Sequence, residues 1–198
     1  GLVGSEMCIR DSACPTCLAK ASRVAMPEGA AVTVSRSAQA RSARALTGWL
    51  LLAALVVLLD RLSKEAVLDI LKITQVIEFT GFFNLVLAFN SGAAFSFLAD
   101  AGGWQRWFFS AVAVLAALVM LWLLHRHAAE RLFAFSLSML LGGAIGNLWD
   151  RLLWGHVVDF LQFHAMGWYF PAFNLADSAI TLGAGLLMLD ALRRPRQS

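Results

Sequence analysis

Four long runs of apolar residues dominate the sequence, and the charged residues in each run fall toward its ends. A helix needs about 20 mostly apolar residues to cross the hydrocarbon core of a bilayer. The runs cover residues 46–68, 105–125, 131–151 and 171–190. The pattern therefore predicts four transmembrane helices, which place both ends of the chain on the same side of a membrane.

The segment between the first two runs, residues 69–104, has a different pattern. Residues 73–79 and 82–89 are rich in β-branched and aromatic side chains, and Thr80 and Gly81 separate them. Two such runs around a short turn indicate a β-hairpin. The predicted fold class is therefore a mainly α membrane protein with four transmembrane helices and a small extracytoplasmic β-sheet between the first and second helices.

The composition agrees with a membrane protein. Hydrophobic residues make up 59% of the chain and charged residues 15%, whereas about a quarter of a soluble domain is charged. The net charge of +3 comes from residues 1–45, with six basic residues and three acids, because residues 46–198 carry ten of each. The membrane body is neutral, so we expect no nucleic-acid partner.

The first 44 residues lack the periodicity of a helix or strand. Their content of Ala and Ser predicts either a disordered tail or a non-native leader. All three cysteines of the chain, Cys8, Cys14 and Cys17, lie in this segment. The C-x-x-C spacing of the last two can bind zinc or do redox chemistry, but no second pair or histidine cluster accompanies it. We therefore expect domains at 1–44 (tail), 45–192 (membrane body) and 193–198 (basic cytoplasmic tail).

Basic residues orient the predicted helices. The flanks on the side of the two termini hold eight arginines, and those on the other side hold five basic residues. Positively charged flanks stay in the cytoplasm. Both termini are therefore predicted to be cytoplasmic.

The acidic residues of the predicted helices gather at one depth. At about 1.5 Å per residue, Asp60 and Asp177 each lie about 20 Å from the inner ends of their helices. Asp150 lies about 28 Å from Arg131 by the same rise, and Asp159 follows the third helix. Ionisable side chains are costly in a membrane and mark functional sites. We expect such a site near the outer boundary.

Asp159 and Asp177 are the candidate catalytic residues. Each could instead be an interfacial residue or a helix cap. Two carboxylates a few ångströms apart cannot both ionise freely, so one holds a proton while the other is charged. The charged one can take a proton from water and the protonated one can polarise a peptide carbonyl, as in aspartic proteases. The pair therefore indicates peptide hydrolysis.

Other polar residues repeat at helical spacing beside the pair. Asn147, Asp150 and Arg151 share one face of the third helix, and Asp60 and Lys64 are four residues apart in the first. These residues are either boundary ion pairs or supports that orient the two aspartates.

Small residues and histidines carry less information. Close helix packing is predicted at five glycines, Gly142, Gly143, Gly146, Gly183 and Gly185. His156 and His164 flank Asp159, but the spacing of a zinc protease is missing. No metal ion is expected.

Five blocks of the sequence give it a close resemblance to the lipoprotein signal peptidase, or signal peptidase II, family. They occur in the family's order and cover about residues 45–192. They are Asp60-Arg-Leu-Ser-Lys64, Asn90-Ser-Gly-Ala-Ala-Phe95, Gly142-Gly-Ala-Ile-Gly-Asn-Leu-Trp-Asp-Arg151, Val157-Val-Asp-Phe160 and Phe173-Asn-Leu-Ala-Asp-Ser-Ala-Ile180.

The resemblance implies a bacterial inner-membrane aspartyl endopeptidase with a periplasmic β-cradle and no cofactor. It would act as a monomer on diacylglyceryl-modified prolipoproteins and cut just before the lipidated cysteine. Asp159 and Asp177 would be the catalytic pair. Supporting or substrate-contacting residues would be Asp60, Lys64, Asn90, Gly92, Asn147, Asp150, Arg151 and Asn174. Arg61 stands where the family more often has Gln, and residues 1–44 have no counterpart.

Two other functions compete with this interpretation. A small transporter or channel subunit would use buried carboxylates as a proton relay, but its charges would be spread through the membrane depth. A non-catalytic assembly protein would use its polar helix ends to bind a partner. Replacement of either aspartate by asparagine separates both alternatives from a peptidase.

Overall fold

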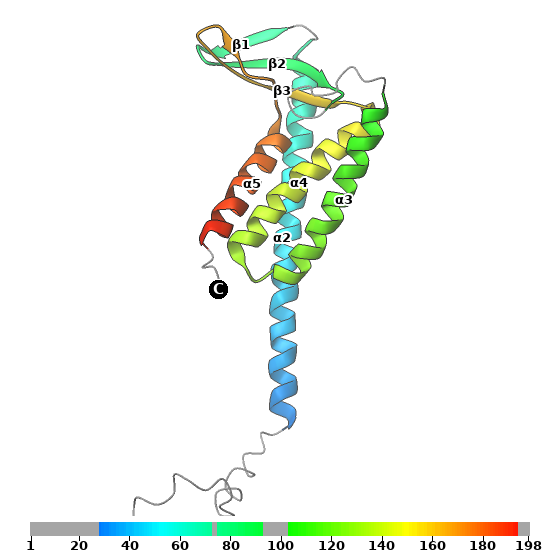
Figure 1. Cartoon of the computed structure of the whole chain (residues 1–198), viewed down its shortest axis with the longest axis vertical. Helices are drawn as coiled ribbons and strands as arrows, with labels where there is room; N and C mark the ends of the chain where they lie inside the picture. Colours follow the sequence, from blue (N-terminus) through cyan, green and yellow to red (C-terminus); the bar gives the residue numbers. More distant parts are fainter. Residues whose placement is uncertain (1–27, 73–74, 93–102, 194–198) are drawn as a thin grey trace, which may run out of the picture. The chain divides into compact units, whose positions relative to one another are not determined.

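The computed structural model describes residues 28–72, 75–92 and 103–193, with side chains from residue 42 onward. The chain divides into two compact units, Gly1–Arg41 and Ser42–Ser198, and the site lies in the second. The elements, all but β4 labelled in Figure 1, are α2 (Glu28–Ile70), β1 (Val76–Thr80), β2 (Phe83–Asn90), α3 (Trp104–His127), α4 (Arg131–Trp154), β3 (Val157–Ala165), β4 (Trp168–Tyr169) and α5 (Leu175–Arg193).

The four predicted membrane helices are confirmed. Among the described residues, Ser42–Ile70, Trp104–His127, Arg131–Trp154 and Leu175–Arg193 are long and apolar enough to cross a membrane. The fourth helix begins four residues later than the apolar run suggests. Phe173 is held in a β-bridge with Leu161, so the chain is extended there and turns helical only afterwards.

Residues 28–44 were expected to belong to the tail, but their backbone is helical and continuous with the first span. Alanine and arginine, which are frequent there, have high helix propensity, and an existing helix is extended at little cost. The three cysteines and the rest of the predicted tail, residues 1–27, lie outside the described residues. The native or non-native origin of the tail stays a prediction.

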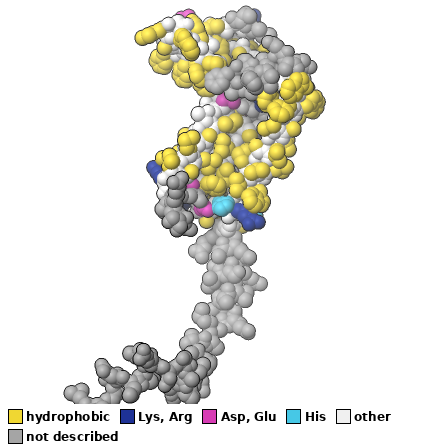
Figure 2. All heavy atoms as spheres, in the orientation of Figure 1, with side chains coloured by type: hydrophobic (Ala, Val, Ile, Leu, Met, Phe, Trp, Pro, Cys, Tyr) yellow, Lys and Arg dark blue, Asp and Glu magenta, His cyan; other side chains and the backbone are white. Residues whose placement is uncertain are grey.

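Helix α4 is the central helix of the second unit. It packs against both α3 and α5. Half of its most apolar 18-residue stretch is buried, compared with 11–17% of the equivalent stretch in each of the other three helices. Figure 2 shows hydrophobic side chains over much of the visible face of the helices. The exposed apolar faces of α2, α3 and α5 are thus suited to contact lipid.

Glycines let the helices approach closely, as predicted, at most of the expected positions. A Cβ on Gly142 would lie 2.7 Å from Cβ of Val56 in α2, and one on Gly183 would lie 2.7 Å from the Ser136 carbonyl oxygen in α4. The prediction is wrong for Gly185, because a Cβ there would meet nothing within 4 Å.

An antiparallel sheet with the strand order β1-β2-β3-β4 joins the helices at one end of the unit (Figure 1). The predicted hairpin is confirmed as β1 and β2; residues 73–74 of its first run lie outside the described residues. Strands β3 and β4, between α4 and α5, were not predicted. The pairing of Ala88 with Asp159 places one candidate aspartate inside the sheet.

Candidate active site

Asp159 lies on β3 with 3% of its surface exposed. Its two carboxylate oxygens accept hydrogen bonds from two amides: Asn90 Nδ2 at 3.1 Å and Asn174 Nδ2 at 2.7 Å. Asn90 is the last residue of β2 and Asn174 directly precedes α5. The sheet and the start of α5 therefore hold this carboxylate together.

Asp177 lies in the first turn of α5 and is half-buried. Its backbone N–H donates to Asn174 Oδ1 at 2.9 Å, and its Oδ2 accepts from the Asn174 backbone N–H at 3.3 Å. This reciprocal pattern is a capping box in which Asn174, not Asp177, is the N-cap residue. Because the other oxygen, Oδ1, accepts from Asn147 Nδ2 at 2.7 Å, the residue also takes part in the buried polar network.

Asn174 links the two aspartates. The residue has no exposed surface, its Nδ2 donates to Asp159 Oδ1, and its Oδ1 and backbone N–H bond Asp177. Both carboxylates therefore contact one residue: that of Asp159 accepts from its side-chain amide and that of Asp177 from its backbone N–H. Burial, reinforced by the negative charge of Asp177, raises the pKa of Asp159 from 3.8 to about 7, against the opposing effect of its two amide donors. Such asymmetry is what a proton-sharing pair requires.

Lys64 is a fully buried cation near the pair. Its Nζ lies 2.7 Å from Asp60 Oδ2 and 2.7 Å from Asp150 Oδ2, and none of the three side chains is exposed. Nζ also donates to Asn147 Oδ1 at 3.3 Å. Since Asn147 Oδ1 faces a cation, its Nδ2 must face the other way, toward Asp177. Lys64 thereby fixes the orientation of the amide that bonds Asp177.

Asp60 connects α2 to the start of α5. Its Oδ1 accepts the Ala176 backbone N–H at 2.9 Å, and Ala176 immediately precedes Asp177. Gly146 of α4 leaves room for this contact, because a Cβ there would lie 2.7 Å from Asp60 Oδ2. Three helices thus meet at the residue before the aspartate.

Arg151 fixes the chain that follows β2. Its Nη2 donates to the Gly92 carbonyl oxygen at 3.0 Å, and the Gly92 N–H donates to Asn90 Oδ1 at 3.0 Å. With Oδ1 of Asn90 occupied by a donor, its Nδ2 faces Asp159. The same orienting arrangement thus serves both aspartates.

The sequence left the role of Arg61 open. The structure places its Nη1 at 3.1 Å from Asp150 Oδ1 and its Nη2 at 2.6 Å from Glu65. The guanidinium also stacks over Trp154, 4.6 Å from the ring centroid. Arg61 therefore stabilises the outer side of the buried ion cluster. The i,i+4 spacing of Arg61 and Glu65 was the one signal of this role in the sequence.

The predicted site residues lie together. One connected set of hydrogen bonds and ion pairs joins Asp159, Asp177, Asp60, Lys64, Asn90, Gly92, Asn147, Asp150, Arg151 and Asn174. The two flanking histidines make ring contacts instead, His156 with Phe89 and His164 with Tyr169. Among the described residues, no group of three or more His, Cys, Asp or Glu is arranged to hold a metal ion. The catalytic roles of the network stay predictions.

Comparison with known proteins links this network to one family. The family model described as signal peptidase (SPase) II matches residues 52–193, which include every residue of the network. The lipoprotein signal peptidase of Ralstonia nicotianae is 57% identical over 149 residues, covering 75% of this chain and 86% of the relative. That of Paraburkholderia phytofirmans is 55% identical over 168 residues, covering 84% and 98%.

Solved structures agree. A structure described as a bacterial membrane enzyme aligns with a TM-score of 0.67 at 28% identity, covering 77% of this chain and 94% of its own. A second, with the same description, aligns with a TM-score of 0.65 at 30% identity. The four helices and the sheet are therefore arranged as in membrane enzymes.

Proposed function

Since the chain belongs to the signal peptidase II family, we propose that it is a membrane aspartyl endopeptidase that removes the signal peptide from diacylglyceryl-modified prolipoproteins. It cuts the bond just before the lipidated cysteine. The protein is a multi-pass membrane protein and a protease by family. The aspartic mechanism, the cleavage position and the roles of the site residues are the proposed details.

One observation carries the mechanism: Asn174 contacts both carboxylates, and burial raises the pKa of Asp159, the more buried of the two, to about 7. At neutral pH the pair is thus suited to hold a single proton. We assign that proton to Asp159. Asp177 is then the charged partner, because it is the more exposed of the two carboxylates and water stabilises a negative charge.

The reaction proceeds by acid–base catalysis with water as the nucleophile. The water oxygen attacks the scissile carbonyl carbon while Asp177 takes a proton from that water. At the same time Asp159 gives its proton to the carbonyl oxygen. The resulting diol collapses as the carbon–nitrogen bond breaks. Asp177 then passes its proton to the leaving amine, and Asp159 recovers a proton from the diol. The pair returns to its starting state.

The remaining network positions the pair. Lys64 and Asn147 orient a donor toward Asp177, and Arg151 and Asn90 do so for Asp159. These groups are positioning residues: Asn90 and Asn147 bond the aspartates directly. Lys64 and Arg151 act on the aspartates through those two asparagines. The chemistry of the network needs neither a metal ion nor an organic cofactor.

The proposed location is the bacterial inner membrane, with both termini cytoplasmic and the aspartates at the periplasmic face. The arginine bias of the flanks supports this orientation. Large side chains of the sheet and of its β1–β2 turn are exposed, including Phe79 at 69%, Phe82 at 58% and Trp168 at 82%, which suits a sheet resting on the outer leaflet. The substrate's acyl chains stay in the bilayer while water reaches the pair from outside. Residues 45–192 form the peptidase domain and act as a monomer.

A proton-translocating protein is the weaker alternative. A relay across the membrane needs ionisable groups at successive depths, whereas Asp60, Lys64 and Asp150 form one cluster with the aspartate pair. Among the described residues, no buried Asp, Glu, Lys or Arg continues from this cluster toward the other end of the helices.

The test replaces each aspartate separately. We expect Asp159→Asn and Asp177→Asn each to lower cleavage of a diacylglyceryl-modified precursor by roughly 100-fold or more, since each removes a proton-transfer group. Purified full-length enzyme in lipid nanodiscs and gel separation of precursor and product measure this. Asp69→Asn is the matched control, because Asp69 is an exposed acid of α2 outside the network.

Two results would contradict the proposal. Cleavage retained in either aspartate variant, with folding equal to wild type, removes that residue from catalysis. Equal cleavage of the precursor with and without its diacylglyceryl group removes the lipid from recognition.

A further inference from the structure

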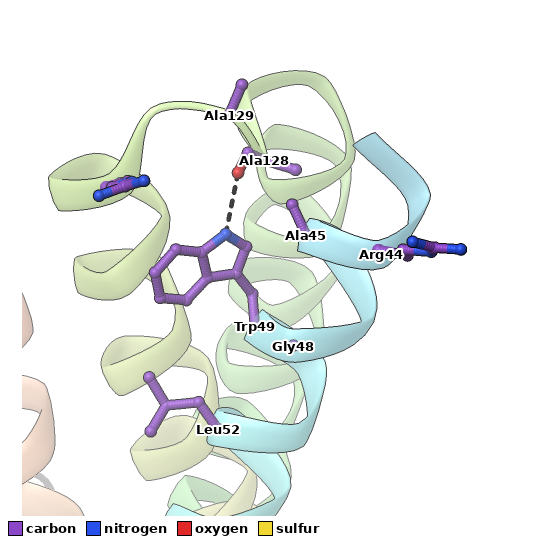
Figure 3. Close-up of a pocket in the computed structure, with 8 residues that line it drawn as sticks. Arg44, Ala45, Gly48, Trp49, Leu52, Ala128 and Ala129 are labelled. Atoms are coloured by element: carbon purple, nitrogen blue, oxygen red, sulfur yellow. Dashed lines mark hydrogen bonds between the residues drawn. The ribbon is translucent and has the colours of Figure 1, made fainter. Parts of the chain in front are cut away.

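A second site, drawn in Figure 3, is lined by residues at the opposite ends of the helices from the aspartates. It is a pocket of about 410 Å³ between α2 and the turn joining α3 to α4. Its lining includes Arg44, Gly48, Trp49, Leu52, Ala128 and Arg131. None of these residues belongs to the polar network of the active site.

Depth separates the two sites. Gly48 and Asp60 are twelve residues apart in α2, or about 18 Å at the helical rise. Arg131 begins α4 and Asp150 lies near its end, about 28 Å away. In the proposed orientation, which this inference shares with the proposed function, the pocket lies at the cytoplasmic boundary of the membrane.

The wall of the pocket is apolar and held in place. The Trp49 indole lies against the turn, and its Nε1 donates to the Ala128 carbonyl oxygen at 2.9 Å (Figure 3). Leu52 continues the apolar surface one turn deeper along α2. At Gly48 a Cβ would meet nothing within 4 Å, so the helix surface is open there. An extended hydrocarbon chain fits such a surface.

The rim of the pocket is cationic. Arg44 on α2 and Arg131 on α4 are both exposed, and neither pairs with a carboxylate among the residues that the structure describes. The nearest acid in sequence, Glu130, is not part of the lining and lies 2.6 Å from His127 Nδ1. The rim is therefore suited to an anion.

We propose that this pocket binds one anionic phospholipid of the cytoplasmic leaflet. Its phosphate lies at the rim bordered by Arg44 and Arg131, and one acyl chain lies along Gly48 and Leu52 against Trp49. A soluble phosphate would leave the apolar wall unused, and a choline headgroup would bring a cation toward two arginines. The bound lipid connects α2 to the α3–α4 turn, at the end of the bundle away from the sheet.

The experiment measures lipid retention by native mass spectrometry of the full-length protein released from detergent. Phosphatidylglycerol and phosphatidylcholine with identical acyl chains are the two probes. We expect one phosphatidylglycerol to be retained at least tenfold more tightly than phosphatidylcholine. The double variant Arg44→Gln/Arg131→Gln lowers that affinity about tenfold or more, because each basic residue near an anionic headgroup contributes a severalfold effect.

Two further variants make the result specific. Arg126→Gln is the matched control: Arg126 is exposed at the same end of α3 but stacks on Trp122 and does not line the pocket. We expect it to bind phosphatidylglycerol as the wild type does. Gly48→Leu adds a side chain where the protein leaves open space, so it blocks the acyl chain while the protein stays folded.

The outcomes divide clearly. Selective retention that is lost in the double variant and in Gly48→Leu, but kept in Arg126→Gln, supports the site. Equal retention of the two lipids, or an unchanged affinity in the double variant, overturns it. Cleavage of precursor by the Asp159 and Asp177 variants is independent of this measurement, so the two proposals can fail separately.

Discussion

At the scale of single residues, three asparagines decide which way the carboxylates are held. Each of Asn90, Asn147 and Asn174 receives a donor on its oxygen and turns its nitrogen toward an aspartate. An amide cannot ionise, so it supplies a fixed donor at any pH. A carboxylate in the same place would face Asp159 or Asp177 with a second negative charge.

The first prediction at this scale concerns pH. Because the mechanism needs a protonated Asp159, whose pKa is about 7, we expect kcat/KM to fall about tenfold per pH unit above pH 7. Cleavage of a lipidated precursor between pH 5 and pH 9 measures this alkaline limb. A rate that stays flat to pH 9 contradicts the assignment of the proton to Asp159.

The same titration predicts a change in stability. The folded-state pKa of Asp159 lies above the value of 3.8 for an ordinary aspartate, so between the two values the folded protein binds more protons than the unfolded chain. The contribution of Asp159 to stability is then largest at low pH and falls as the pH rises toward 7. The Tm of the wild type should therefore drop relative to that of Asp159→Asn between pH 5 and pH 8, whereas Asp69→Asn should follow the wild type. Parallel Tm curves for the wild type and Asp159→Asn contradict the prediction.

At the scale of helices and strands, the sequence predicted what depends on local pattern. Apolar runs located the four helices, and β-branched residues located β1 and β2. Strand β3 was missed, although Val157, Val158 and Phe160 carry the same β-branched and aromatic signal. The first four residues of this strand are all buried, so its apolar and polar residues do not alternate clearly. Its partner strand β2 is distant in the sequence, so no local hairpin pattern indicates the pairing.

The sequence indicated which residues lie in the candidate site, but not which contacts they make with one another. Within one helix, the spacing of Asp60 and Lys64 predicts a pair. The contacts that orient the site join elements distant in the sequence: Lys64 to Asn147 spans 83 positions and Asp60 to Ala176 spans 116. No local pattern encodes such contacts. A backbone donor such as the Ala176 N–H also cannot be inferred from the sequence, because almost every residue type carries a backbone N–H.

Glycine packing gives the prediction at this scale. A Cβ on Gly143 of α4 would clash with the Ala176 carbonyl oxygen and lie 2.7 Å from Ile180 Cγ1. Gly143→Ala should therefore push α5 away, lower the Tm by several degrees and reduce cleavage, because Asp177 follows Ala176. The measurements are a thermal melt and a precursor assay in the same detergent.

Gly185→Ala is the matched control for this substitution. Gly185 lies in α5, the helix that Gly143 contacts, and its added Cβ meets nothing within 4 Å. Alanine has a higher helix propensity than glycine by up to about 1 kcal/mol, so this variant should be as stable as the wild type or more so. Equal effects of the two substitutions would mean that helix propensity, not close packing, governs both positions.

At the scale of the whole second unit, the site exists only when five elements are assembled. The residues of the network come from α2, β2, α4, β3 and α5, with Gly92 just beyond β2. All of them meet at the end of the helices that carries the sheet, while exposed apolar residues cover the faces of the helices. The unit has two chemically different ends, a buried polar cluster at one and a cationic pocket rim at the other. The orientation of the helices in the membrane determines which end faces the periplasm.

The orientation can be measured because all three cysteines of the chain lie in residues 1–17. Changing these to serine leaves a cysteine-free membrane body for single substitutions. Met166, fully exposed in the turn between β3 and β4, marks the end with the aspartates, and Ala129, exposed between α3 and α4, marks the other. We expect a membrane-impermeant maleimide to label Met166→Cys in cells with a permeabilised outer membrane. Ala129→Cys should be labelled only after the inner membrane is opened, and the reverse pattern would place the aspartates in the cytoplasm, where a periplasmic signal peptide end cannot reach them.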